Sequence, residues 1–321
     1  MINETVVFAL TASVDLANEI VGHLDMPLGE VSVKHFADGE ILVELEETVR
    51  GRDVYIVQST CAPVTERLME VLICIDACKR ASAKEINLVM PYFGYARQDR
   101  KSRPRQPITA KLVANLLQTA GAHRLITTDL HASQIQGFFD IPTDDLTAVP
   151  MLGQYFAHKK LGEDVVVVSP DHGGTTRARK LAEVLNAPLA IVDKRRPKAN
   201  HAEAMNVIGD VDGKIAIIVD DLVDTAGSLI ASVNILKEKG AKEIYCACSH
   251  GVLSGPAIER IESSPIKELV ITNSISLSEE KKAASTKITS LSIGLMLART
   301  ISAIQSHSSV SEVYDLFTLN K

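Results

Sequence analysis

Several patterns that mark large protein classes are missing from this chain of 321 residues. It contains no run of 18 apolar residues and no basic-then-apolar opening segment, which argues against a membrane-spanning helix and a secretory leader. The formal net charge is −6, so the chain as a whole does not attract nucleic acid, and any site for a polyanion must be local. We therefore expect a soluble, cytoplasmic protein with neither a nucleic-acid nor a membrane partner.

The cysteines lack the spacing of a redox motif. An odd number without a Cys-x-x-Cys pair indicates reduced thiols in a cytosolic setting. Cys74 and Cys78 are one helical turn apart, and Cys246 and Cys248 share one strand face, so a structural zinc site is an alternative. Buried thiols more commonly serve as small apolar side chains, and this is the interpretation that we prefer.

Short β-branched runs alternate with helical patterns, which is typical of βαβ units around parallel sheets. A stripe of apolar residues ended by Gly121 predicts one helix especially clearly: Leu112, Val113, Leu116, Leu117 and Ala120. The runs predict strands over residues 54–58, 86–90, 125–128, 165–169 and 215–219, and helices over residues 65–80, 110–120 and 176–185.

The length suggests two domains at roughly 150 residues each, and no low-complexity linker separates them. A fresh series of strand and helix patterns follows Pro150, which we take as the boundary. We expect an α/β protein with two parallel-sheet domains, residues 1–149 and 150–321, with the extreme C-terminus packing back on the first.

Ligands of such sheets bind at the carboxyl ends of the strands, so the polar residues there are the candidates for a site. His131 follows the predicted strand over residues 125–128, and Asp171 and His172 follow that over residues 165–169. Asp220 follows the strand over residues 215–219. Each strand end presents a group that suits a metal or a phosphate.

The window IAIIVDDLVDTAGSL, residues 215–229, joins a buried strand, two carboxylates, a small-residue loop and a helix start. Backbone N–H groups of such a loop form a phosphate site at the helix N-terminus. Asp220 and Asp221 are too acidic for a pure anion site and suit ribose hydroxyls or phosphate-bound magnesium. The window favours a phosphorylated ribose as ligand; the alternative is a solvated turn with N-capping acids.

The window SPDHGGTT, residues 169–176, repeats this order of strand, acid, glycines and hydroxyls. Paired glycines let a ligand approach the backbone closely, which suits a pyrophosphate or triphosphate, with Asp171 reaching magnesium. An ordinary strand-to-helix turn is the alternative.

Two basic clusters supply cations. Residues 94–105 carry Arg97, Arg100, Lys101, Arg103 and Arg105 after three aromatic residues, which suits phosphates and a purine. A solvated loop or a single-strand nucleic-acid patch are the alternatives. The window DKRRPKAN, residues 193–200, predicts a loop that closes over a triphosphate and stabilises charge in phosphoryl transfer, unless it is a solvated charge run.

Six windows together resemble the ribose-phosphate pyrophosphokinase (PRPP synthetase) family of the phosphate-activated class, in that family's order: FADGE (36–40), YARQDRK (95–101), DLHASQIQGFF (129–139), SPDHGG (169–174), DKRRP (193–197) and VDDLVDTAGS (219–228). The last window is also similar to the motif of type I phosphoribosyltransferases, and the resemblance implies that each domain has their fold. It implies an enzyme of nucleotide biosynthesis, a transferase that moves the pyrophosphoryl group of ATP to the 1-hydroxyl of ribose 5-phosphate, giving PRPP and AMP.

The resemblance also implies roles for individual residues. ATP contacts Phe36, Asp38 and Glu40 of a neighbouring subunit together with Arg97, Gln98 and Asp99. Magnesium contacts His131 and Asp171, and the pyrophosphate loop consists of Asp171, His172, Gly173 and Gly174. Ribose 5-phosphate binds to Asp220, Asp221, Asp224, Thr225, Ala226, Gly227 and Ser228, and the transition state is stabilised by Lys194 and Arg196.

Regulation by inorganic phosphate as an activator, in a homohexamer, is the last implication of the resemblance. The regulatory residues would be Thr48, Arg50, Arg80, Ser82, Ser309 and Ser311. Tyr314 departs from the family pattern, which has Phe there. Two other functions stay open at this point: a regulatory homologue that binds nucleotides beside an active subunit, and a phosphoribosyltransferase that consumes PRPP.

Overall fold

The computed structural model describes residues 4–162, 164–195 and 204–317. The chain divides into two compact units. The first holds Met1–Thr147, Ser274–Ser276 and Ser292–Val313, and the second holds Ala148–Asn273, Leu277–Leu291 and Tyr314–Lys321. The first unit therefore takes in residues 292–313 from the far end of the chain.

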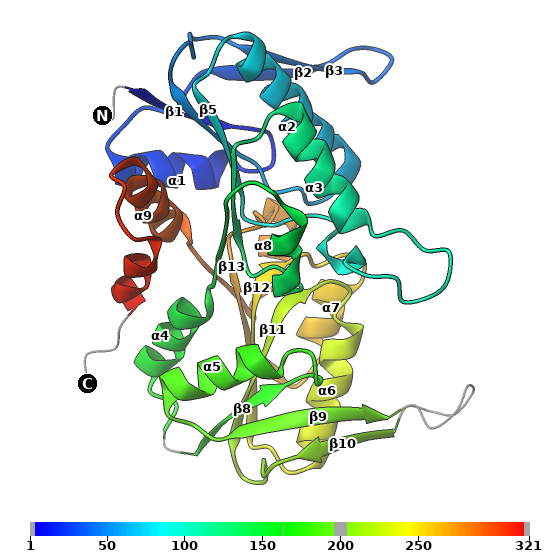
Figure 1. Cartoon of the computed structure of the whole chain (residues 1–321). Helices are drawn as coiled ribbons and strands as arrows, with labels where there is room; N and C mark the ends of the chain where they lie inside the picture. The colour runs from blue at the N-terminus through cyan, green and yellow to red at the C-terminus, as the bar shows by residue number, and fades with distance from the viewer. Residues whose placement is uncertain (1–3, 163, 196–203, 318–321) are drawn as a thin grey trace. The chain divides into compact units, whose positions relative to one another are not determined.

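The first unit is built on a parallel sheet in the order β1-β4-β5-β6-β7. Helices α1 and α9 lie on one side of it, and α2 and α3 lie on the other (Figure 1). The strands are β1 (Thr5–Ala9), β4 (Asp53–Val57), β5 (Glu85–Met90), β6 (Arg124–Thr128) and β7 (Thr143–Leu146), and the helices are α1 (Val14–Leu24), α2 (Val64–Arg80), α3 (Thr109–Ala120) and α9 (Gly294–Gln305).

An antiparallel hairpin, β2 (Val31–His35) and β3 (Ile41–Leu45), extends from this unit. Residues 36–40 form its tip, all of them exposed. Gly39 has φ +93°, a backbone angle that favours glycine. The N–H of Phe36 donates to the carbonyl of Glu40 across the tip at 2.9 Å, which fixes the turn.

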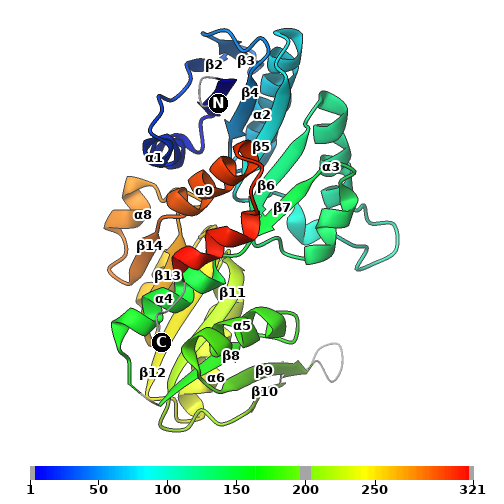
Figure 2. The same ribbon diagram turned by 60° about the vertical axis from the view of Figure 1, so that its left-hand side comes forward.

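The second unit is built on a seven-stranded sheet in the order β10-β9-β8-β11-β12-β13-β14. Every neighbouring pair is parallel except β9 with the edge strand β10. Figures 1 and 2 show α4 and α5 on one side of the sheet and α6 on the other. The strands are β8 (Val165–Ser169), β9 (Leu189–Arg195), β10 (Ala204–Ile208), β11 (Ile215–Val223), β12 (Glu243–Gly251), β13 (Ile266–Thr272) and β14 (Ile288–Leu291), and the helices are α4 (Val149–Lys159), α5 (Thr175–Leu185), α6 (Gly227–Glu238), α7 (Ala257–Glu262) and α8 (Glu279–Ala283).

The prediction of an α/β protein with two parallel sheets is confirmed. The predicted strands over residues 54–58, 86–90, 125–128 and 165–169 and all three predicted helices agree with the structure to within one residue at each end. Central strands such as β4 and β8 are apolar and buried along most of their length because helices cover both faces of each sheet.

The apolar stripe of α3 proves to cover two faces of that helix. Val113 and Leu117 are buried against the sheet, together with two alanines that the stripe did not include. Leu112 and Leu116 are exposed instead, by 54% and 40%. The prediction of a helix is confirmed, but the periodicity alone did not separate the packed face from the exposed one.

All five cysteines lie in the described part of the chain and carry free thiols. Burial raises the pKa of the Cys246 thiol, and burial next to Asp220 and Asp221 raises that of Cys248. These thiols stay protonated and act as small apolar side chains in the sheet. None of the helices in the described ranges has the length and apolar character needed to cross a bilayer.

Candidate functional site

Three sequence windows meet at one edge of the second unit's sheet. Strands β9, β8 and β11 are parallel neighbours, so their carboxyl ends lie at the same edge. The loop over residues 170–174 follows β8, Asp193 lies near the end of β9, and the two aspartates lie near the end of β11. This edge is also where the known ligands of open parallel sheets bind.

Strand β11 is longer than the sequence predicts. The expected strand ends at Val219, but pairing with β12 continues to Val223, with Asp220 opposite Cys248. The two acids are therefore held within the sheet rather than on a loop after it. The apolar run could not indicate this, because strands at a ligand site carry polar residues that break the apolar pattern.

Asp220 and Asp221 form a close acidic pair that shares one arginine. Arg177, from the first turn of α5, lies 3.7 Å from a carboxylate oxygen of Asp220 and 3.8 Å from one of Asp221. The N–H of Asp221 donates to Asp220 Oδ1 at 2.9 Å. Arg177 lies in the helix that follows the SPDHGGTT loop, whereas the two aspartates lie on β11. The ion pairs of Arg177 therefore connect the two sequence windows.

The charge of this pair is only partly neutralised. Burial, and next the negative charge of Asp221, raise the pKa of Asp220 to about 8, while the Arg177 guanidinium acts in the opposite direction. The pair therefore holds a proton at neutral pH when no ligand is bound. A ligand that offers cationic charge or hydroxyl donors would displace this proton, which is the behaviour of a binding site rather than of a structural ion pair.

The loop over residues 224–226, which leads into α6, is fixed by hydrogen bonds from neighbouring segments. Ala226 has φ +61° and directly precedes α6, so the chain turns sharply into the helix N-terminus. The carbonyl of Asp224 accepts from Ser254 N–H at 3.0 Å, and that of Thr225 accepts from Arg260 at 2.8 Å. With its carbonyls bound on the outside, the loop leaves the N–H groups at the start of α6 as an anion site.

The loop after β8 is ordered by its own acid. Asp171 accepts from Gly174 N–H at 3.0 Å, and its carbonyl accepts from Ser169 Oγ at 2.6 Å. A Cβ at Gly174 would lie 3.0 Å from Ser169 Oγ, tighter than most real contacts, so the loop favours glycine there. Asp171, His172 and Gly173 are exposed in front of α5. The predicted strand–acid–glycine–helix order is present.

His172 links this loop to the neighbouring strand. Its Nε2 lies 3.0 Å from a carboxylate oxygen of Asp193, which is only 7% exposed. Lys194 follows Asp193 within β9, opposite Met205 of β10. The window DKRRPKAN was expected to be a loop from its start; instead its first three residues continue the strand. Arg196 lies outside the described residues.

The predicted ATP residues all lie in the first unit. Phe36, Asp38 and Glu40 occupy the exposed hairpin tip, where Asp38 Oδ1 accepts from Glu40 N–H at 3.1 Å. Arg97 and Gln98 lie in a 3-10 turn, Ala96–Gln98, which Asp99 follows. The Gln98 side chain accepts from Thr109 Oγ1 at the start of α3.

The two residues predicted to contact magnesium belong to different units. His131 is exposed in the first unit, on a loop anchored by Leu130 N–H donating to Asp145 at 3.0 Å. Asp171 is exposed in the second. Within residues 4–162, 164–195 and 204–317, no cluster of three metal-ligating side chains occurs. The exposed carboxylate of Asp171 fits magnesium carried by substrate phosphates, which takes one or two protein ligands and keeps water on its other positions.

Two of the predicted regulatory residues are brought together. Arg50 donates to Ser82 Oγ at 3.0 Å, and Ser82 has φ +64°. Arg80 instead pairs with Asp76 along α2 at 2.6 Å, and Thr48 is exposed. Ser309 and Ser311 bond to each other at 2.6 Å near the C-terminus. An arginine beside a hydroxyl suits a phosphate oxygen.

Sequence reasoning assigned no role to Arg177 or to Asp193. The sequence does contain a sign that Arg177 has a partner. A cation in the first turn of a helix interacts unfavourably with the helix dipole, so its position there indicates a stabilising partner outside the helix. That partner is the acidic pair on β11. Asp193 lay inside a recognised window, but only the fold shows that it faces His172.

Comparison with known proteins shows which protein family this chain resembles. The N-terminal domain model of ribose phosphate pyrophosphokinase matches residues 5–121, and the phosphoribosyl synthetase-associated domain model matches residues 167–315. The ribose-phosphate pyrophosphokinase of Bacillus caldolyticus is 61% identical over 308 residues, which cover 96% of this chain and 97% of that protein. The protein of the same name from Bacillus subtilis is 58% identical over 308 residues, 96% of each chain.

A solved structure agrees over the same length. The crystal structure of phosphoribosylpyrophosphate synthetase from Mycobacterium smegmatis superposes with a TM-score of 0.90 at 43% identity, covering 95% of this chain and all of that one. With two family models in order along the chain and relatives near 60% identity over almost its whole length, the chain belongs to the ribose-phosphate pyrophosphokinase family.

Proposed function

We propose that this protein transfers the β,γ-pyrophosphoryl group of ATP to the 1-hydroxyl of ribose 5-phosphate, giving PRPP and AMP. The observation that carries the proposal is the edge of the second unit's sheet, where an acidic pair and two helix N-termini converge in a chain of this family. Hydroxyl donors and phosphates are the ligands that such a combination binds.

In this proposal ribose 5-phosphate binds at the end of β11. Asp220 and Asp221 accept from ribose hydroxyls, and the N–H groups over residues 224–228 bind the 5-phosphate at the start of α6. Asp224, Thr225 and Ala226 form the loop before that helix, and Gly227 and Ser228 are its first residues. Arg177 keeps the carboxylates ionised enough to accept, since a nearby cation lowers the pKa of Asp220.

The transferred group lies against the neighbouring loop. Gly173 and Gly174 let the pyrophosphoryl oxygens approach the backbone, and His172, fixed by Asp193, adds a donor. Lys194 and Arg196 neutralise charge as the 1-hydroxyl oxygen attacks the β-phosphorus and the bond to the AMP oxygen breaks. Catalysis here rests on positioning and electrostatics, as is general for phosphoryl transfer.

ATP is assigned to residues of the first unit. Arg97, Gln98 and Asp99 hold the nucleotide, and Phe36, Asp38 and Glu40 of a neighbouring subunit meet the adenine in a homohexamer. His131 and Asp171 would contact magnesium carried by the phosphates, and the ion would supply charge neutralisation at the phosphate oxygens. A cytoplasmic location and activation by inorganic phosphate complete the proposal.

The test is AMP formation from ATP with magnesium and inorganic phosphate, with and without ribose 5-phosphate. AMP that appears only with the sugar, together with stoichiometric PRPP, supports the proposal. If ATP binds but no AMP forms with the sugar present, the proposal fails in favour of a regulatory homologue. Pyrophosphate released from PRPP on adding a purine or pyrimidine base would identify a phosphoribosyltransferase instead.

Replacing Arg177 with Gln is expected to raise KM for ribose 5-phosphate roughly tenfold at pH 7. Without its arginine the pKa of Asp220 rises further, so a smaller fraction of the pair accepts from hydroxyls. The defect should shrink as pH rises toward 9, because ionisation is then restored. KM measured from pH 6.5 to 9 checks this.

Arg177→Lys and Arg179→Gln are the matched controls for that change. The lysine keeps the charge and should restore most of the affinity at pH 7. Arg179 is an exposed residue two positions further along α5 and should leave KM unchanged. A defect in Arg177→Gln that does not depend on pH would contradict the electrostatic role.

Replacing Arg50 with Gln is expected to raise the phosphate concentration for half-maximal activation by about tenfold while leaving the maximal rate intact. The change removes the charged partner of Ser82 and hence a charge-assisted bond to a phosphate oxygen. Titrating phosphate at saturating substrates measures it. Lys239→Gln, an exposed cation in the second unit, is the control, and equal activation curves for wild type and Arg50→Gln would contradict the assignment.

A further inference from the structure

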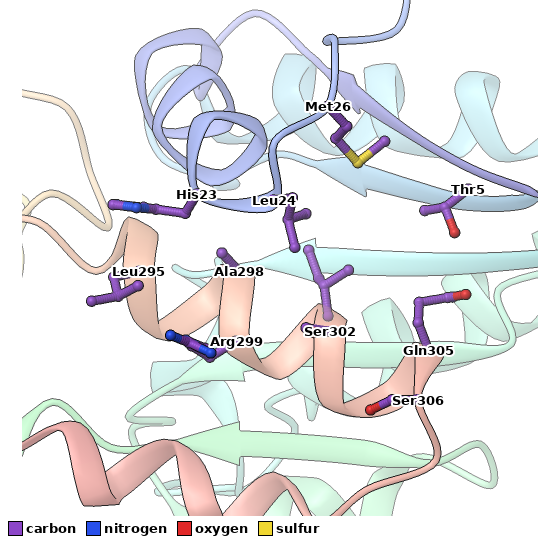
Figure 3. A pocket seen from close by; sticks show the side chains of 11 residues that line it. Thr5, His23, Leu24, Met26, Leu295, Ala298, Arg299, Ser302, Gln305 and Ser306 are labelled. Carbon is purple, nitrogen blue, oxygen red and sulfur yellow. The ribbon is translucent and has the colours of Figure 1, made fainter. Parts of the chain in front are cut away.

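A pocket of about 300 Å³ lies within the first unit, where α1 and α9 pack beside β1. Figure 3 shows the side chains that surround it. This volume is close to that of the smallest pockets that typically bind small molecules. The residues used by the proposed reaction do not line it. The lining residues are Thr5, His23, Leu24, Met26, Leu295, Ala298, Arg299, Ile301, Ser302, Gln305 and Ser306.

The pocket has a charged side and a neutral polar side with an apolar wall between them. Figure 3 shows His23 and Arg299 toward one side and Thr5 and Gln305 toward the other. Leu24, Met26, Leu295, Ala298 and Ile301 supply the aliphatic surface. No carboxylate occurs among the described residues that line the pocket, so Arg299 gives it a positive character.

Thr5 provides an independent sign of a missing partner. The residue is only 3% exposed, and its buried hydroxyl oxygen has no hydrogen-bond partner in the described structure. Its carbonyl is satisfied separately by Arg52 at 2.8 Å. A buried hydroxyl without a partner is costly, and a native fold tolerates it where another molecule completes the bond. Gln305, beside it in Figure 3, is already bound to Tyr55 at 2.8 Å and so is fixed in place.

We propose that this pocket binds a small organic anion with a short aliphatic body and a polar group at its far end. The anionic head, a carboxylate or a phosphate monoester, pairs with Arg299. The aliphatic body covers the apolar wall, and the far polar group bonds to the Thr5 hydroxyl. This ligand is distinct from ATP and ribose 5-phosphate, because the apolar wall between the two polar sides offers no partners for the hydroxyls of a ribose.

The first experiment uses the full-length protein with labelled methionine methyl groups and four probes: hexanoate, 6-acetamidohexanoate, hexyl phosphate and hexanamide. We expect the three anions to shift the methyl resonance of Met26 saturably, with the acetamido compound binding best. Met151, in the second unit, should not respond. Hexanamide, which has the same body without charge, should bind at least roughly tenfold more weakly, as expected for loss of a charged hydrogen bond.

Three variants test the geometry. Arg299→Gln should weaken all three anions by roughly tenfold without affecting hexanamide. Thr5→Val should remove the advantage of 6-acetamidohexanoate over hexanoate while leaving hexanoate binding unchanged. Valine keeps the shape of threonine, so this variant should also be at least as stable as wild type, because the unpartnered hydroxyl is gone. Ala298→Trp should fill the pocket and abolish binding.

The readout is binding, so it does not depend on the proposed reaction. Retained anion binding in Arg299→Gln and Ala298→Trp would overturn the proposal. So would an Arg299→Gln variant that changes the oligomeric mass without changing probe affinity, since this face would then be a contact between copies. The absence of a saturable shift of the Met26 methyl resonance at probe concentrations up to millimolar would also overturn the proposal.

Discussion

Replacing Lys194 with Ala is expected to lower the rate of AMP formation by roughly 100- to 1,000-fold while ATP affinity changes little. Loss of one preorganised group that stabilises transition-state charge typically has this size. A group acting only in the transition state lowers kcat and kcat/KM equally, whereas one that binds ground-state ATP raises KM. Lys194 continues β9 directly after Asp193, which His172 contacts, so its backbone is held by the sheet.

Single-turnover quench experiments measure the chemical step, and titration calorimetry measures ATP binding because the chain has no tryptophan to report it. Lys214→Ala is the matched control: it removes a lysine of the same unit that pairs with Asp210 on the surface. Lys194→Arg should recover part of the rate. Equal losses in turnover and in ATP affinity would assign Lys194 to binding and remove it from the transition state.

Replacing Asp220 with Asn is expected to make the ligand-free protein more stable at pH 8 and nearly inactive. The pKa of Asp220 is about 8 in the folded protein against 3.8 for an ordinary Asp, so the folded state binds more protons than the unfolded state between these values. The free energy of unfolding therefore falls as pH rises from about 4 to 8 and levels off above that. Asn cannot ionise, so this slope should flatten.

The gain in stability at pH 8 should be about 1–3 kcal/mol, less than the full shift implies, since the side chain is one-third exposed and is coupled to Asp221. Urea unfolding at pH 5 and pH 8 measures it. Asp210→Asn is the control with the opposite sign, because Lys214 lowers the pKa of Asp210 and its contribution is lost only in acid. Identical pH dependence of the unfolding free energy in wild type and Asp220→Asn would show that folding does not raise the pKa of Asp220.

The activity of Asp220→Asn should fall at least roughly 100-fold, since Asn keeps the shape but loses the charge that accepts from two hydroxyls. A variant that is both more stable and less active is the signature of a site whose groups are arranged for a ligand rather than for the fold. Proton release on binding ribose 5-phosphate, measured in weakly buffered solution, should disappear in the same variant.

The sequence predicted β4, β5, β6, β8 and the first part of β11, because a strand covered on both faces is apolar. β8 and β5 were therefore found to within a residue. β7, Thr-Asp-Asp-Leu, was missed because an edge strand is partly solvated and carries polar residues. The continuation of β11 through Asp220 and Asp221 was missed for a related reason: pairing with β12 overrides the poor strand preference of Asp.

For the site, the sequence allowed us to predict which residues bind ligands, but not which side chains contact one another. Asp171, Asp220 and the glycines could be selected because each follows a strand that the apolar pattern predicts. That Arg177 bridges the acids, or that Asp193 orients His172, depends on which strands are neighbours, and strand order does not follow from local pattern. Lys194 was placed in a loop because it follows the apolar run Leu189–Val192 and precedes Pro197, and the pairing with β10 shows otherwise.

The position of α9 has a consequence for how the chain acquires its structure during synthesis. This helix packs against α1 and binds Tyr55 of β4 through Gln305, yet it is encoded after nearly the whole second unit. The first unit thus leaves the ribosome with one face of its sheet covered by α1 alone, and α9 completes that face only when the last part of the chain emerges. A second unit that folds late therefore delays completion of the first, and a protein cut short before α9 lacks part of the cover on the sheet at its beginning.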